Sequence, residues 1–435
     1  MKPAGTRKNK ESSADTEPRP RIWRNKNVST FKHTKLNNQL DIIAEVMPTA
    51  RTAAIGFMVK TGSRDEEPQV SGVSHFLEHM MFKGTERRSA ADINREFDSL
   101  GARNNAFTSN EVTCYWAQVL PEYLPAALDI LADMMRPALR EDDFNMEKNV
   151  ILEEISLYLD KPGHVLYERI MEDHFGAHPM AQSILGSKES ITALSQQQMR
   201  NYFDRHYGPG NMVLAAAGQI NFDELVQLTD QACGRWPSVA VERRYPPLTH
   251  SARRHHIRDE KLKRHYICML CRGPSAQDME RFSAAVLADV IGDHDGSRFF
   301  WSLIEPGLAE EADFSTFPHD GLGSFYAYAS CDPAKADLVE ETMIRELGRV
   351  RIVGVAEDEI ARSKTKISTS TVMSGELPLG RMRNLCSQWI YNREFRTLEQ
   401  DLAELEKVNL PSIGDLLTKY PFEPLTITTL GPGDR

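Results

Sequence analysis

Residues 71–84 read Ser-Gly-Val-Ser-His-Phe-Leu-Glu-His-Met-Met-Phe-Lys-Gly and contain the arrangement His75-x-x-Glu78-His79. On an α-helix, residues four positions apart lie on one face, so the imidazoles of His75 and His79 can reach the same metal ion. Glu78 lies beside them, where a carboxylate can act as a general base. The stretch therefore predicts a helix that combines a metal site with a base, and we expect this helix to end at Gly84.

The residues around this polar trio are apolar. Apolar side chains lie between the three polar residues and directly after them: Phe76, Leu77, Met80 and Met81. This pattern is typical of a buried helix. A buried polar group without a partner costs about 1 to 3 kcal/mol, so two histidines and a glutamate in such a helix need a ligand. The alternatives are a chance match of a short pattern and a hydrogen-bonded core histidine, but a core histidine explains only one of the three side chains.

A second helix, predicted to run through Leu159, carries further carboxylates. Glu147 and Glu154 are two turns apart on one face, beside an apolar stripe that can pack on another helix. A zinc site with two histidines needs a third protein ligand and an open position for water. From the residues alone, Glu154 or Glu153 can provide that ligand. The alternative is that both are solvated carboxylates, which is the usual environment of glutamate.

The composition of the whole chain is that of a globular protein with two domains. It has 435 residues, of which 41% are apolar and 26% charged, and no apolar run approaches the roughly 20 residues of a membrane helix. Asp and Glu number 62 against 52 Lys and Arg, so the net charge gives no reason to expect a nucleic-acid partner. We expect no membrane span and no nucleic acid.

The first 26 residues differ from the rest. They are basic and almost free of apolar side chains, which predicts a disordered tail. They lack the apolar run of a signal peptide, and their acidic residues and prolines disfavour an amphipathic targeting helix. We therefore expect a cytoplasmic location.

Three motifs together indicate a family. The stretches HFLEHMMFKGT (75–85), SLGARNNAFTS (99–109) and EKNVILEE (147–154) occur in this order. The chain, from about residue 28 to 430, resembles the pitrilysin-type zinc metallopeptidases, or inverzincins, whose signature is His-x-x-Glu-His. Periodicity alone predicts only a mixture of helices and strands. The resemblance implies an α+β fold of two homologous domains, each an antiparallel sheet with helices packed on it, related by an internal repeat.

The resemblance also implies a division of the chain. Residues 1–26 are the tail, 27–240 the zinc-binding catalytic domain, 241–258 a linker and 259–435 a homologous domain without metal ligands. Prolines at 237, 246 and 247 interrupt the periodic pattern at the expected junction.

The resemblance also assigns roles to individual residues of the predicted zinc site. The resemblance implies that His75, His79 and Glu154 hold one Zn²⁺ per chain. Glu78 then is the general base that takes a proton from the attacking water. Glu147 is a supporting carboxylate outside the ligand set.

The same resemblance implies a place for the substrate. In relatives, the segment that corresponds to Asn105, Ala106 and Phe107 is an edge strand to which a peptide adds as a further β-strand. We expect these three residues to contact substrate, mainly through backbone hydrogen bonds. The alternative is an ordinary sheet edge.

One departure from the family concerns a substrate clamp. Relatives that clamp substrate from the second domain show Arg and Tyr in a Leu-Arg-x-x-x-Gly-Leu-x-Tyr stretch, whereas residues 303–310 here read LIEPGLAE, with Ile304 and Glu310 at those places. Single-chain relatives are about twice as long and close two halves around the substrate. We therefore expect a dimer, and specifically a heterodimer in which a related chain supplies the Arg-Tyr pair.

The function predicted from these residues is a zinc endopeptidase that hydrolyses extended peptides or unfolded polypeptides. The alternative is a non-catalytic scaffold or assembly subunit, because some relatives keep the fold and lose the ligands. A third interpretation, a metal-binding module without peptidase activity, leaves Glu78 dispensable. The presence of all four motif residues favours the enzyme.

Overall fold

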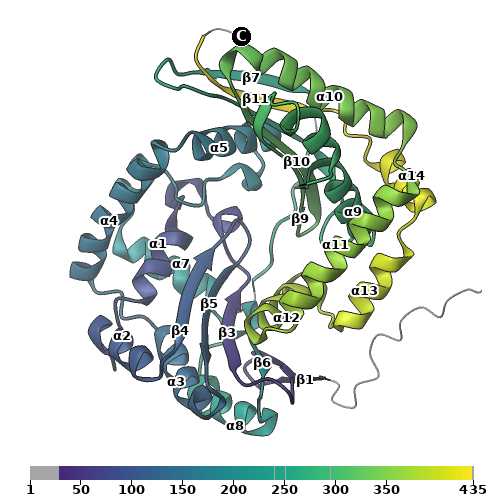
Figure 1. The fold of residues 1–435 in the computed structure, drawn as a ribbon. Helices are drawn as coiled ribbons and strands as arrows, with labels where there is room; N and C mark the ends of the chain where they lie inside the picture. The colour runs from purple at the N-terminus through teal and green to yellow at the C-terminus, as the bar shows by residue number, and fades with distance from the viewer. Residues whose placement is uncertain (1–28, 240, 250, 294, 434–435) are drawn as a thin grey trace, which may run out of the picture.

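The computed structural model describes residues 29–239, 241–249, 251–293 and 295–433, and the predicted tail of residues 1–26 lies outside them. The described chain forms two β-sheets with helices packed on them (Figure 1). This confirms the predicted α+β class with two related domains. Among the described residues, no helix combines the length and the hydrophobicity needed to cross a membrane.

The first sheet has six strands. Their spatial order is β1 (Thr30–Lys35), β2 (Asp41–Val46), β6 (Met212–Gly218), β3 (Ala53–Val59), β5 (Thr113–Val119) and β4 (Arg103–Thr108). All neighbours are antiparallel except β2 and β6. The apolar runs before and after residue 50 form β2 and β3, but the distant strand β6 lies between them.

The helices of this half pack on one face of the sheet, except the helix of residues 162–175, which packs on the second sheet. They are α1 (Val73–Met81), α2 (Ala90–Ser99), α3 (Leu124–Met134), α4 (Glu141–Leu159), α5 (Pro162–Phe175), α6 (Lys188–Ala193), α7 (Gln196–His206) and α8 (Phe222–Cys233). The largest core cluster lies between the sheet and this helical layer.

The second sheet repeats the first without its outermost strand. Its order is β7 (Arg253–Arg258), β11 (Thr426–Gly431), β8 (His265–Gly273), β10 (Leu322–Cys331) and β9 (Ala309–His319), again with one parallel pair, β7 and β11. Its helices are α9 (Arg281–Gly292), α10 (Ala336–Val353), α11 (Glu357–Gly375), α12 (Pro378–Asn392), α13 (Leu398–Lys407) and α14 (Leu410–Lys419). The predicted linker, residues 241–258, includes β7.

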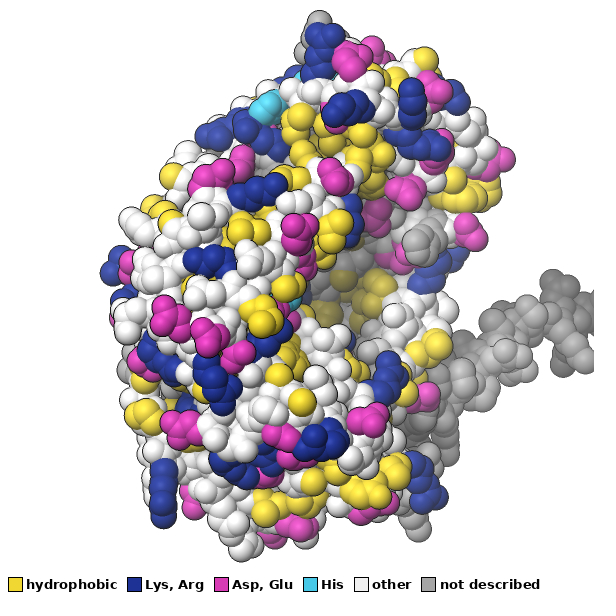
Figure 2. Space-filling model, turned by 90° about the vertical axis from the view of Figure 1, so that its left-hand side faces the viewer, with side chains coloured by type: hydrophobic (Ala, Val, Ile, Leu, Met, Phe, Trp, Pro, Cys, Tyr) yellow, Lys and Arg dark blue, Asp and Glu magenta, His cyan; other side chains and the backbone are white. Residues whose placement is uncertain are grey.

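Each half packs one helix on the sheet of the other half. Met382 and Leu385 of α12 are buried against the outer face of the first sheet, and Leu166 and Ile170 of α5 are buried against the second sheet (Figure 1). Both faces of the central strands are therefore covered, which explains why strands such as β3 are apolar along their whole length. Seen from the side that carries α4 and α5, the molecule is hollowed, with hydrophobic side chains on the walls of the recess (Figure 2).

Candidate metal centre

The start of α1 is held by a buried carboxylate. Glu66 accepts hydrogen bonds from the backbone N–H groups of Gly72 and Ser74, both at 2.7 Å. Gly72 has a φ of +89°, and a Cβ there would lie 2.5 Å from the carbonyl oxygen of Leu185. Only glycine suits this position, so the entry into the helix is sterically defined.

The end of α1 differs from the prediction. The helix stops at Met81, three residues before Gly84, because the N–H of Phe82 already closes a tighter turn on the carbonyl of His79. Gly84, with a φ of +109°, instead lies in a turn that forms a β-bridge to Ser89.

Packing between α1 and α4 brings distant residues together. The rings of Phe76 and Phe144 stack with centroids 4.7 Å apart and planes 14° apart, and Ile151 of α4 is fully buried. This contact sets the position of α4 against α1, so that the carboxylate of Glu154 faces the imidazoles on α1.

His75, His79 and Glu154 form one group. Glu154 Oε2 lies 3.9 Å from His75 Nε2 and 3.6 Å from His79 Nε2, and one ligand atom from each residue lies within 4.8 Å of the others. Glu153 is exposed and is not in this group, so the structure brings Glu154 rather than its neighbour to the histidines. Among the described residues, no other group of His, Cys, Asp and Glu converges in this way.

The donor set fits zinc. Two imidazole nitrogens and a carboxylate oxygen are the ligands of open zinc sites, and metal–ligand bonds of about 2.1 Å place tetrahedral ligands roughly 3.4 Å apart, close to the distances here. Burial, together with the charge of His79, lowers the pKa of His75 to about 4, which favours the neutral imidazole that a metal requires. The side chains of His79 and Glu154 stay 26% and 27% exposed, so water and substrate can reach the group.

Glu147 contacts His79 through the ring nitrogen that does not face Glu154. Its Oε1 lies 2.9 Å from His79 Nδ1, and its Oε2 lies 2.5 Å from Lys83 Nζ. Burial acts to raise the pKa of Glu147, but the contacts with Lys83 and His79 outweigh it and lower the pKa. Lys83 is a further residue of the site that the sequence did not single out, although it lies only four residues after His79, just beyond the end of α1.

The carboxylate of Glu78, which is not part of the metal group, contacts strand β4. The hydroxyl of Thr108 donates to Glu78 Oε2 at 2.6 Å. Burial raises the pKa of Glu78, and the Thr108 bond and the charge of His79 only partly offset it. Thr108 is another residue that the sequence did not single out, although strand alternation puts it on the same face of β4 as Ala106.

The predicted substrate residues lie on an open sheet edge. β4 pairs with β5 only, so its other side is free of strand neighbours among the described residues. The N–H of Ala106 donates to Asn105 Oδ1 at 2.8 Å. Phe107 is half-buried and lies on the opposite face of β4 from Thr108. The edge is next to α1, as peptide addition beside the metal group requires.

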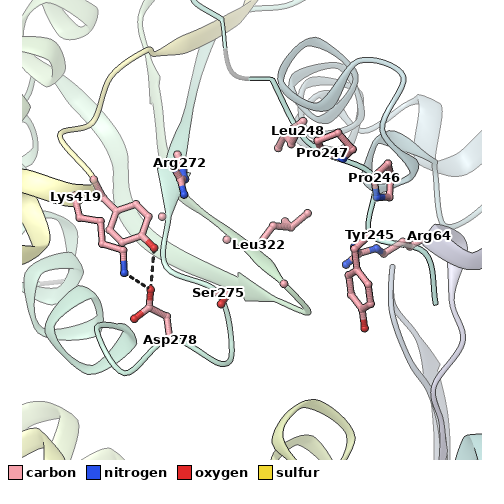
Figure 3. A pocket seen from close by; sticks show the side chains of 14 residues that line it. Arg64, Tyr245, Pro246, Pro247, Leu248, Arg272, Ser275, Asp278, Leu322 and Lys419 are labelled. Carbon is pink, nitrogen blue, oxygen red and sulfur yellow. Dashed lines mark hydrogen bonds and ion pairs between the residues drawn. The ribbon is translucent and has the colours of Figure 1, made fainter. Parts of the chain in front are cut away.

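A separate pocket of about 570 Å³ lies where the linker passes between the halves (Figure 3). Tyr245 and Arg64 form one wall, and Asp278 on the opposite wall is bound by Lys419 at 2.8 Å and by the Tyr420 hydroxyl at 2.9 Å. None of the metal-group residues lines it.

Comparison with known proteins identifies the family. The family model described as insulinase (peptidase family M16) matches residues 32–188, and that of the peptidase M16 inactive domain matches residues 193–367. An uncharacterized zinc protease of Streptomyces coelicolor is 31% identical over 422 residues, covering 93% of this chain and 90% of the relative. One from Bacillus subtilis is 30% identical over 408 residues, covering 92% of this chain and 98% of the relative. The chain belongs to the M16 peptidase family.

Solved structures share the fold. A protease from Helicobacter pylori has a TM-score of 0.87 at 19% identity, covering 93% of this chain and 100% of that chain. An M16-like peptidase from Alicyclobacillus acidocaldarius has a TM-score of 0.81 at 23% identity, covering 93% and 99%. A chain of complex III2 from Candida albicans has a TM-score of 0.81 at 18% identity, covering 92% and 95%.

Proposed function

We propose that the protein is a zinc-dependent endopeptidase that hydrolyses extended peptides or unfolded polypeptides. The observation that carries the proposal is the convergence of His75, His79 and Glu154, with the carboxylate of Glu78 on the same helix and an open strand edge beside it.

In this proposal His75, His79 and Glu154 hold the ion. Bound zinc supplies a Lewis acid, which polarises a peptide carbonyl and makes water acidic enough to ionise near neutral pH. Thr108 holds Oε2 of Glu78, which leaves Oε1 to accept the proton of the attacking water and to return it to the leaving amine. Because burial raises the pKa of Glu78, its protonated form is easier to reach than that of an exposed glutamate.

The substrate is an extended chain, because β4 offers backbone groups rather than a closed side-chain pocket. The N–H of Ala106, now bound to the Asn105 amide, is available to a peptide once Asn105 turns away. Asn105, Ala106 and Phe107 are therefore the substrate-contacting residues of this proposal.

The second candidate function is that of a non-catalytic assembly subunit. Two observations support it. Residues 193–367 match a family model named for an inactive domain, and the fold is similar to that of a chain of complex III2. The expected partner chain with an Arg-Tyr pair stays a prediction.

Zinc content and its dependence on Glu154 test the proposal. We expect about one Zn²⁺ per chain in the purified protein, and a metal-poor, inactive Glu154→Gln variant, because an amide is a weaker zinc ligand than a carboxylate. The measurements are elemental analysis by mass spectrometry and cleavage of a quenched peptide library. Glu153→Gln, the same change one residue away on the exposed side, should keep both zinc and activity. A metal-free wild-type protein, or one that binds zinc and cleaves nothing, would favour the assembly subunit.

Substitution of Glu147 should weaken zinc binding without abolishing it. In Glu147→Gln the amide cannot match the carboxylate as partner of His79 Nδ1, and Lys83 loses its counter-charge. We expect zinc affinity to fall roughly 10- to 100-fold. Competition with a chromophoric chelator measures this, and an unchanged affinity would show that Glu147 does not orient His79.

A further inference from the structure

The two faces of β4 look in different directions. Ala106 and Thr108 pack toward α1 and Glu78, whereas Asn105 and Phe107 lie on the face covered by α12. Side chains of a peptide strand added to this edge must alternate in the same way, because neighbouring strands share their pleat. Every second side chain of such a peptide therefore lies on the face of α12 and away from the metal group.

A cation is held on this second face. The guanidinium carbon of Arg383, an exposed residue of α12, lies 4.9 Å from the ring centroid of Trp116 on β5 and 5.7 Å from that of Phe107 on β4. The two rings hold the guanidinium over the last two strands of the sheet. The next strand position is only about 4.8 Å beyond β4.

In the part of the chain that the structure describes, Arg383 has no ion-pair partner. Among the described residues, no carboxylate oxygen lies within the 4.0 Å ion-pair distance of its guanidinium. Its neighbours on the same helix differ, because Arg381 is buried against Glu45 and Arg393 pairs with Asp41 at 2.9 Å. Arg383 is thus an exposed cation that two aromatic rings position beside an open strand edge.

We propose that Arg383 selects peptides that carry an acidic side chain on the α12 face of the added strand. The aromatic rings fix the guanidinium and reduce the entropy lost when it binds a carboxylate, and its planar fork suits two parallel N–H···O bonds. This inference rests on the proposed function, because it takes the β4 edge as the substrate site and names the substrate class of that site.

The test is a binding scan. A neutral, extended fluorescent peptide is varied by placing one Glu at each position in turn, and affinity is measured by anisotropy for the full-length Glu78→Gln protein. We expect Glu to improve affinity roughly three- to tenfold over Gln, and the favourable positions to share one parity along the peptide. Adding Arg383→Gln should abolish this preference, and Arg383→Glu should reverse it in favour of Lys at the same positions.

Arg362→Gln, which removes an exposed arginine paired with Asp358 on α11, is the matched control and should leave the preference intact. Equal affinity for Glu and Gln peptides, or a preference that survives Arg383→Gln, would overturn the inference. Binding is read without turnover, so an inactive wild-type protein with an Arg383-dependent preference would refute the peptidase function alone.

Discussion

Replacing Glu78 with glutamine is expected to lower kcat by about 10²- to 10⁴-fold while zinc content stays at the wild-type level. Glu78 is not among the three converging ligand residues, and glutamine keeps its shape and can still accept the hydrogen bond from Thr108 Oγ1. The substitution therefore removes the proton acceptor and little else. The measurements are steady-state cleavage of a quenched peptide and elemental analysis of the same preparation.

The result separates the roles of neighbouring residues. If Glu78→Gln loses activity together with zinc, Glu78 contributes to the metal site itself, and if it keeps activity, the general-base assignment is wrong. Glu153→Gln again serves as control, because Glu153 is an exposed glutamate near the site with no part in the ligand group.

The second large effect is expected at the junction of the halves. Glu111, which is 1% exposed, binds Arg64 at 2.5 Å and the Tyr391 hydroxyl at 3.1 Å, and lies 3.2 Å from His319 Nδ1. These partners come from both halves, and Arg243 of the linker lies 3.8 Å away.

Glu111→Gln removes the carboxylate that pairs with the buried guanidinium of Arg64, whereas Arg243 keeps Asp65 and Asp320. A buried charge left without its partner should destabilise the protein by about 3 to 5 kcal/mol. Because the entropy of unfolding grows with chain length, at about 2.1 cal/mol/K per residue, we expect the midpoint of thermal unfolding of this 435-residue chain to fall by roughly 3 to 6 °C.

The same residue makes this stability depend on pH. Burial acts to raise the pKa of Glu111, but the contact with His319 and the charges of Arg243 and Arg64 outweigh it and lower the pKa from 4.5 to about 2. The stabilisation is therefore present above about pH 4.5 and is lost as the pH falls toward 2. The gap in unfolding midpoint between wild type and Glu111→Gln should be largest near neutral pH and narrow below pH 4.5.

Asp358→Asn is the control, because it removes an exposed ion pair with Arg362 within α11. It should leave the unfolding midpoint unchanged both near neutral pH and below pH 4.5. A Glu111→Gln protein as stable as the wild type would show that this network does not hold the halves together.

Local spacing in the sequence was enough for part of this picture. The shared helical face of His75 and His79 and the position of Glu78 beside them follow from the helical period of 3.6 residues, which fixes side-chain direction whatever the rest of the chain does. That the strand around Ala106 lies at a sheet edge was expected only from the family resemblance. The end of α1 was misjudged, because Gly84 signals a turn with a positive φ and not specifically the end of a helix.

Other features depend on contacts between distant segments. The choice of Glu154 over Glu153 follows from the stacking of Phe76 on Phe144, and the partner of Glu78 comes from β4, 30 residues away. The placement of β6 between β2 and β3, the packing of α5 and α12 on the sheet of the other half, and the position of Arg383 over Phe107 have no local signal. By itself the sequence predicted which residues could carry the chemistry and on which faces of their helices and strands they lie. Only tertiary packing decided which faces meet. Burial of apolar surface stabilises any well-packed pair of faces, however far apart the two segments lie in the sequence.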